Sequence, residues 1–535
     1  MKKALRLICV LLTAAIMFSL CACSEKEDES TSDGQDNTDN KPVLTYSITL
    51  PVAHNDTIDP FKDISSVNRS LVTLLYDGLV LIDEGFTAQP LLISSHTNDG
   101  RVLTVTLRND ITFSDGSAIN ASDVVYSFDQ SKKSSYYAPR LTNIKSASAH
   151  GNSVSFELIS EDINALACLD FPVVKSGTVQ TQYDDTNLFD ITPPTGAGRY
   201  IINGKLPAAK LTPNPHCNRS ESLSIGTISL FEVNDSDGMS YGLQIDNYDY
   251  WYNDLSTGQY TRVNAGLNVV PSNNLIYLAF NEEKSIFTED VVRRAVSMLI
   301  DRNAIASQGF QGHATSASVP FNPAWSAMKK VTVSTQMSAD IDGAKAILEK
   351  AGYTSINHYG YRCSNSKSLN CNLTVCRDNE FKVAAAKQIK EQLAKLNFNV
   401  RIIELPYKEY AQAIAQGDYE MYLGEVKIPA NMNITDFFTS YGTPNCDLVL
   451  TKETEESTTT YTVCHNEYKD FLAGKLSIAD FCKAFETEVP FVPVCYRSGI
   501  EIYSREFTSE IRGTCYDNFY NIDTWSIKTK TEEEK

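Results

Sequence analysis

The feature that most constrains the fold is an alternation of strand and helix patterns between residues 372 and 423. Two short apolar runs, Asn372–Cys376 and Val400–Leu405, predict buried strands. Between them, apolar residues recur at the spacing of one helix face: Val383, Ala386, Ile389, Leu393 and Leu396. A second helix face is made of Tyr407, Tyr410, Ala411 and Ile414. It ends at Gly417 and precedes a strand at Tyr419–Leu423. This alternation predicts an α/β fold with a partly parallel sheet and covering helices.

The part of the chain before this region is rich in strand patterns. We expect strands at Leu44–Leu50 and Val154–Leu158. Val102–Leu107 and Ile111–Phe113 flank three polar residues and are predicted to pair as a hairpin. A helix should follow, because Asn120 is a favoured N-cap residue.

The N-terminus has the order of a secretory signal. Three basic residues precede an apolar stretch at Leu7–Leu20, which is too short to span a bilayer comfortably. The sequence Leu20-Cys21-Ala22-Cys23 resembles a bacterial lipobox. Residues 1–22 are therefore expected to be a lipoprotein signal peptide, with Cys23 as the lipidated first residue of the mature chain. A plain signal peptide that leaves Cys23 as a free thiol is the alternative.

The residues that follow predict a tether outside the membrane. Residues 23–42 are acidic and lack large apolar side chains after Cys23, apart from their last residue, Pro42, so they cannot offset the entropy of ordering. The expected location is the extracytoplasmic face of the cell membrane, at the cell surface or in the periplasm. No other run of 18 apolar residues competes as a membrane span.

Composition narrows the classes of function. The chain has 535 residues and a net charge of −19, which repels polyanions, so nucleic-acid binding is not expected. Of 13 cysteines, ten lie beyond Cys23, which permits up to five disulfides or a set of structural thiols. No C-x-x-C pair is present and the seven histidines are scattered, so neither a metal site nor a cofactor is predicted.

Several segments, in order along most of the mature chain, carry a family resemblance. They are Thr57–Pro60 (TIDP), Leu75–Val80 (LYDGLV), Leu107–Gly116 (LRNDITFSDG), Thr195–Tyr200 (TGAGRY), Tyr277–Asn281 (YLAFN), Val292–Ala295 (VRRA), Ile300–Arg302 (IDR) and Pro490–Val494 (PFVPV). Together they resemble the extracellular solute-binding proteins of family 5, the dipeptide- and oligopeptide-binding lipoproteins of peptide-type ABC importers. The resemblance implies a monomer that captures a peptide or similar polar solute and delivers it to ABC permease subunits, with the membrane contacted through the lipid anchor alone.

The resemblance also implies an architecture. It is a two-lobed α/β fold of the periplasmic-binding-protein type (type II, large peptide-binding class), with an inserted subdomain and a hinged cleft. The expected boundaries are 43–80, 195–280 and 490–535 for lobe I, 81–194 for the inserted subdomain and 281–489 for lobe II. Tyr46, Leu230 and Val494 should then contribute to one lobe.

Candidate ligand-binding residues follow from position within the family. The stretch after the Asp-Pro motif lines the cleft, which gives Asp63, Ser65 and Ser66; Tyr277 and Asn281 lie near the hinge. Serine and asparagine supply hydrogen bonds to backbone groups, and an acid can pair with a free amine. Ser65 and Ser66 could instead cap a helix that begins near Val67.

One departure from the family pattern concerns the peptide amine. After the segment that corresponds to Gly417–Glu420, peptide binders of this family typically have a Trp followed by an Asp, and the Asp carboxylate pairs with the peptide amine. Both residues are absent here. Glu425, Lys427 or Asp436 could substitute. The solute could also be a modified peptide, an oligosaccharide or another polar metabolite.

A surface-anchored hydrolase is the rival interpretation. Gly238–Gly242 fits G-x-S-x-G with Ser240 at its centre. A nucleophile elbow needs that turn directly after a strand, but four polar residues separate it from the expected strand Ile228–Val233. No recognisable histidine signature follows, so we predict that the protein is not an enzyme and has no catalytic residue.

Overall fold

The structure is a computed structural model that describes residues 46–528, except 235, 256–262, 282–285, 366, 440–443, 445–448 and 454–457. The predicted signal peptide, the lipidated Cys23 and the acidic tether lie outside the described residues, as does Cys446. None of the helices in the described part of the chain has both the length and the apolar character that a membrane span needs.

The predicted α/β region forms one end of a seven-stranded sheet. Its order is β11 (Tyr250–Asn253), β21 (Val492–Tyr503), β12 (Gly266–Phe280), β18 (Met421–Lys427), β16 (Asn370–Cys376) and β17 (Asn399–Leu405), and β13 (Ala314–Ser316) pairs with β21. β16 is parallel to both β17 and β18, whereas β12 is antiparallel to β18 and β21. The partly parallel sheet predicted from the alternation is therefore confirmed.

Helices bury this end of the sheet. They are α5 (Asp290–Leu299), α7 (Ile341–Lys350), α8 (Glu380–Ala394) and α9 (Tyr407–Ala415). Leu278 of β12, Leu373 of β16 and Ile389 of α8 share one apolar core, and each is fully buried. Burial of this kind is the main stabilising contribution to a fold. We call β16, β17, β18, these helices, α10 (His465–Leu472), α11 (Ile478–Glu488) and the loop after β18 lobe II.

A separate four-stranded sheet has the order β1 (Tyr46–Ala53), β10 (Ile225–Val233), β9 (Lys210–Pro213) and β8 (Tyr200–Asn203). The apolar face of α2 (Ser66–Leu75) packs in the same core. Tyr46 and Leu230 contact this core, but Val494 is buried in the core of lobe II. The expectation that Val494 joins them is therefore wrong, because the first residues of β21 pair with β12 beneath the helices of lobe II.

The third sheet has the order β4 (Ile93–Asn98), β5 (Val102–Leu107), β7 (Ser153–Leu158) and β6 (Ile144–His150), and α3 (Ala121–Ser131) packs on it. Asn120 caps α3 in a capping box with Asp123. The hairpin predicted between Val102–Leu107 and Ile111–Phe113 is wrong, since β5 pairs with β4 and β7. We call this sheet, the β1–β8 sheet, their helices and the connecting loops lobe I.

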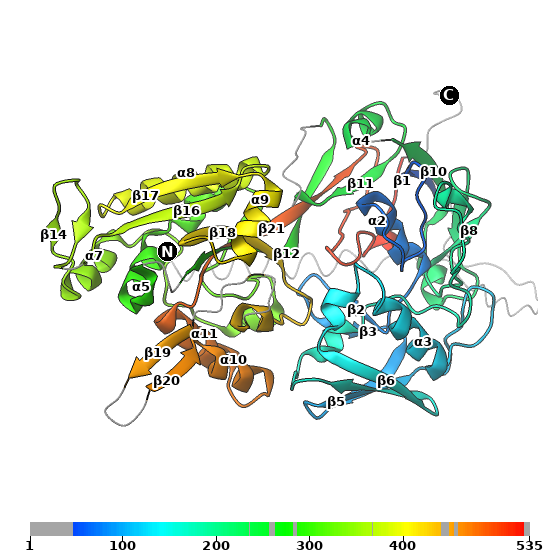
Figure 1. Cartoon of the computed structure of the whole chain (residues 1–535). Helices are drawn as coiled ribbons and strands as arrows, with labels where there is room; N and C mark the ends of the chain where they lie inside the picture. Colours follow the sequence, from blue (N-terminus) through cyan, green and yellow to red (C-terminus); the bar gives the residue numbers. More distant parts are fainter. Residues whose placement is uncertain are drawn as a thin grey trace, which may run out of the picture. The chain divides into compact units, whose positions relative to one another are not determined.

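The remaining elements are short. They are β2 (Val80–Ile82), β3 (Ala88–Pro90), α4 (Ser236–Gln244), α6 (Arg302–Ala304), β14 (Ser355–Ile356), β15 (Arg362–Cys363), β19 (Val449–Glu453) and β20 (Thr458–Thr462). Figure 1 shows β12 and β21 running side by side from lobe II towards β11, whose Tyr250 is buried in the core formed by the β1–β8 sheet and α2. These two long strands connect the lobes.

Candidate ligand-binding site

One pocket lies against the polar face of α2. Ser66, Arg69, Ser70 and Thr73 line this pocket of about 270 Å³, which we call pocket 1. Their spacing of three and four residues places them on one side of the helix, because the opposite side is buried against the β1 sheet. Asn274, Lys427 and Asn518 also line this pocket, and Asn518 Nδ2 donates to the Ser70 hydroxyl at 2.8 Å.

A larger pocket of about 490 Å³, pocket 3, lies between the lobes. Lobe I contributes Tyr136, Arg140 and Ser160, and lobe II contributes Lys427 and Asp436, among others. Tyr136, Lys427 and Tyr516 line both pockets, so the two cavities meet at these side chains. Concave surfaces with a few convergent polar groups are where small solutes bind.

Three cations surround Tyr136 where the pockets meet. The Arg69 and Arg140 guanidinium carbons lie 4.3 and 4.9 Å from its ring centroid, and Lys427 Nζ lies 5.7 Å away. Lys427 makes the largest contribution to lowering the pKa of Tyr136 below its ordinary value. The Tyr136 phenol in turn raises the pKa of Lys427. The local potential is therefore positive although the whole chain is acidic.

The three cations differ in their partners. Arg140 Nη1 lies 2.5 Å from Asp170 Oδ2, and the Arg69 guanidinium donates to the carbonyls of Pro60 and Lys62 at 2.7 and 3.0 Å. Lys427 is exposed within the cleft, and none of the described carboxylates lies within 4 Å of its ammonium. Lys427 is thus placed to bind an anionic group of a solute.

Of the three residues predicted after the Asp-Pro motif, one caps a helix, one lines a pocket and one does neither. The Ser65 hydroxyl accepts from the Asn68 amide at 3.2 Å and caps α2, which is the alternative that the sequence left open. Ser66 lines pocket 1. Asp63 is exposed and accepts from the Ser135 hydroxyl at 3.4 Å, outside the residues lining pockets 1 and 3.

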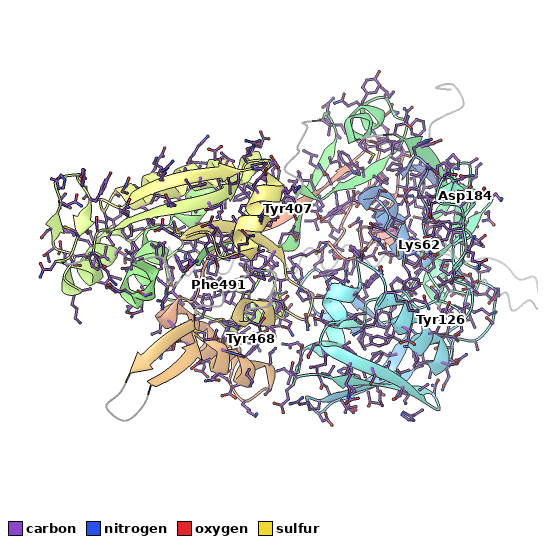
Figure 2. The ribbon with its side chains drawn as sticks, viewed as in Figure 1. Lys62, Tyr126, Asp184, Tyr407, Tyr468 and Phe491 are labelled. Carbon is purple, nitrogen blue, oxygen red and sulfur yellow. The ribbon has the colours of Figure 1, made fainter. Side chains whose placement is uncertain are left out.

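The structure places Tyr277 and Asn281 away from both pockets. The Tyr277 hydroxyl lies 3.0 Å from that of Tyr422, and its ring packs 5.9 Å from Phe491, which is labelled in Figure 2. Asn281 Nδ2 donates to the Gly417 carbonyl at 2.8 Å. Both side chains hold lobe II together in this conformation.

Glu425 does not line pocket 1 but contacts Asn274, which does. Its carboxylate lies 2.9 Å from Lys382 Nζ and 3.7 Å from Arg497 Nη1, and it accepts from Asn274 Nδ2 at 3.3 Å. The side chain is 8% exposed, so Glu425 orients Asn274 and does not itself line pocket 1. Asp436 does line pocket 3, and burial raises the pKa of its carboxyl.

Sequence reasoning missed Arg69, Tyr136, Arg140 and Tyr516. A signal for Arg69 existed, because a helix capped at Ser65 has Ser66, Arg69 and Ser70 on one side. Nothing comparable marks Tyr136 or Tyr516, which come together from loops 380 residues apart in the chain.

The G-x-S-x-G segment does not form a nucleophile elbow. Gly238–Gly242 lies within α4, so Ser240 is in a helix and not at a strand-to-helix turn. The nine described cysteines are free. Across the described residues, no cluster of His, Cys, Asp and Glu has the makings of a metal site.

A two-lobed α/β fold with pockets between the lobes defines a class of solute-binding proteins. Residues 87–445 match the model of the bacterial extracellular solute-binding proteins, family 5. The chain belongs to this family, whose members are the extracytoplasmic binding proteins of ABC importers and not enzymes.

Relatives and solved structures agree with this assignment. The oligopeptide-binding protein AppA of Bacillus subtilis is 24% identical over 75% of this chain and 76% of its own length. The nickel-binding protein NikA of Staphylococcus aureus is 27% identical over 51% of this chain and 54% of its own. The unliganded open form of the periplasmic murein tripeptide-binding protein MppA has a TM-score of 0.70 at 17% identity, covering 91% of this chain and 99% of that one.

Proposed function

We propose that this protein is a lipid-anchored extracytoplasmic solute-binding protein that captures a peptide or similar polar solute between its lobes and delivers it to an ABC import permease. Cys23 carries the lipid, residues 23–42 form the tether, and β12 with β21 form the hinge between the lobes. The solute contacts both lobes in the closed form alone, so its binding favours closure.

The observation that carries this proposal is the junction of pockets 1 and 3 at Tyr136, Lys427 and Tyr516. Lys427 receives an anionic group of the solute, such as a peptide carboxylate. Ser66 and Asn274 supply hydrogen bonds in pocket 1. Of the residues predicted from the sequence, Ser66 and Lys427 are retained as solute contacts, and Glu425 is retained as the residue that orients Asn274.

A thermal-shift screen with peptides and oligosaccharides tests this function. A solute that binds the folded state raises the melting temperature as its concentration rises. Titration calorimetry on Lys427→Gln should show affinity for an anionic hit reduced about tenfold or more, with partial recovery in Lys427→Arg. Lys345→Gln, which removes an exposed lysine 3.9 Å from Glu349, is the matched control.

Two outcomes would contradict parts of the proposal. Hits that are neutral oligosaccharides, bound equally well by Lys427→Gln, would exclude an anionic solute at the junction. A Cys23→Ser variant that remained in the membrane fraction would exclude the lipid anchor.

A further inference from the structure

A buried carboxylate joins the two lobes at a place separate from β12 and β21. Asp162 follows β7 in lobe I and is 0% exposed. Its Oδ2 accepts from Asn431 Nδ2 at 2.8 Å and from Asn433 Nδ2 at 3.3 Å, both in the loop after β18 of lobe II. One oxygen of lobe I thus receives two donors from the other lobe.

Each side of this contact is fixed within its own lobe. The Asp162 amide donates to the Gly100 carbonyl at 3.1 Å, and its carbonyl accepts from Asn98 at 2.9 Å. Asn433 Oδ1 accepts from the Thr435 amide at 2.9 Å and from the Tyr468 hydroxyl at 3.3 Å. These acceptor contacts leave the Asn433 amide nitrogen directed at Asp162.

A main-chain hydrogen bond crosses the lobes beside these side chains. The Ile163 amide donates to the Leu472 carbonyl, at the end of α10, at 3.0 Å. The flanking pair of Glu161 and Lys475 is exposed and 3.5 Å apart, so it contributes little. Asn431 and Asn433 also line pocket 3, as do Ser160 and Asn143 from lobe I.

We propose that Asp162, Asn431 and Asn433 form an interlobe clasp that holds one end of pocket 3 shut. Opening of the lobes breaks both side-chain hydrogen bonds and the bond from Ile163 to Leu472. Among the described residues the Asp162 carboxylate is bonded to amides and to no cation, so water can replace both asparagine amides when the lobes open. Burial raises the pKa of Asp162 to about 6, so at neutral pH the group is ionised and accepts from both asparagines.

Hydrogen exchange at the Ile163 amide tests the clasp in the solute-free protein. In Asp162→Asn, one carboxylate oxygen becomes an NH2 donor, which must face either the Asn431 and Asn433 donors or the Asn164 amide that donates to Oδ1 at 2.9 Å. In both orientations the charged acceptor is lost and one donor is opposed by another donor, so we expect Ile163 to exchange at least tenfold faster. The Leu158 amide, which donates to the Arg101 carbonyl within lobe I at 2.8 Å, should keep its rate. The matched control Glu161→Gln should leave both rates unchanged.

A donor–acceptor swap sharpens the test. Adding Asn431→Asp to Asp162→Asn keeps the net charge and restores an amide-to-carboxylate hydrogen bond, so Ile163 exchange should slow again. If Asp162→Asn does not fold, Asn431→Ala tests the clasp from the other lobe. Unchanged Ile163 exchange, equal acceleration at Leu158 or failure of the swap would overturn the clasp. Because no solute is used, such a failure leaves the proposed function intact.

Discussion

The two halves of β12 differ in the side chains that they bury, although they form one continuous strand. From Leu275 to Phe280 every side chain is buried, and all are apolar or aromatic. From Gly266 to Asn274 burial is interrupted, and Ser272, Asn273 and Asn274 are buried polar residues. The partner strand β21 is buried from Val492 to Ile502, and its buried side chains change from Val492 and Val494 to a stretch that includes Arg497, Ser498 and Glu501.

The difference teaches what each half does. The apolar half lies between the helices of lobe II, where burial on both faces stabilises the fold. The polar half lies where the strands pass between lobes, and Ser272 and Asn274 line pocket 1 there. Buried polar groups stabilise a fold less than apolar ones do, so their presence at this position suits binding and movement.

The largest expected effect comes from the apolar half. Leu278→Ala removes a fully buried side chain from the lobe II core and should lower the free energy of unfolding by about 2–5 kcal/mol. Leu267→Ala, in the polar half of the same strand, alters a side chain that is 46% exposed. This variant should change the free energy of unfolding by about 0.5 kcal/mol or less. Urea denaturation measures both, and equal effects would remove the contrast between the halves.

The second effect is a pH dependence that arises in the polar half. Burial raises the pKa of Glu501 from 4.5 to about 7, even though Asn268 and Tyr250 donate hydrogen bonds to it; the charge of Glu84 adds to the rise. The folded state therefore binds this proton more tightly than the unfolded state does. The stabilisation is complete below pH 4.5 and is lost as the pH rises through about 7.

Glu501→Gln isolates this contribution because glutamine resembles the neutral acid. Between pH 5 and pH 8 the wild type should lose stability relative to the variant, by about 3 kcal/mol at most. Urea denaturation of both proteins at the two pH values gives the difference. The free energy of unfolding of the variant minus that of the wild type should be larger at pH 8 than at pH 5. A difference that does not grow between these pH values would contradict the raised pKa of Glu501.

The sequence predicted the apolar half well and the polar half poorly. Periodicity located β16, α8, β17, α9 and β18, and it works best where apolar residues are buried at regular spacing, as in α8. In α9 the predicted apolar face is not buried as a whole, because Ile414 is buried but Tyr407 is 67% exposed. Apolar periodicity cannot identify Asn274 or Glu501 as buried residues. In the sequence alone, a buried polar residue is indistinguishable from an exposed one, because the partners that satisfy its hydrogen bonds are unknown. The residues around Tyr136 were missed for the same reason.

The family resemblance predicted the fold more reliably than the residues of the binding site. It led to Lys427 and Ser66, which line pockets, but it also selected Tyr277, the first residue of the YLAFN segment, which packs inward. Strand alternation decides this outcome. Tyr277 and Ala279 lie on one face of β12 with the aromatic core beneath them, whereas the pocket is reached three residues earlier, at Asn274.

The smallest expected effect tests that assignment of Tyr277. Tyr277→Phe removes a hydroxyl that lies 3.0 Å from the Tyr422 hydroxyl, while the ring keeps its contacts with Phe437 and Phe491. The loss should be about 1 kcal/mol of stability, the net value of one buried hydrogen bond. Affinity for any solute found in the screen should stay within about twofold of the wild type, because the apolar half of β12 does not line the pockets.

Lys427→Gln should show the reverse pattern, with weakened binding and nearly unchanged stability. A Tyr277→Phe variant that folds normally but binds tenfold more weakly would place the apolar half of β12 in the binding site and end the division drawn between the halves.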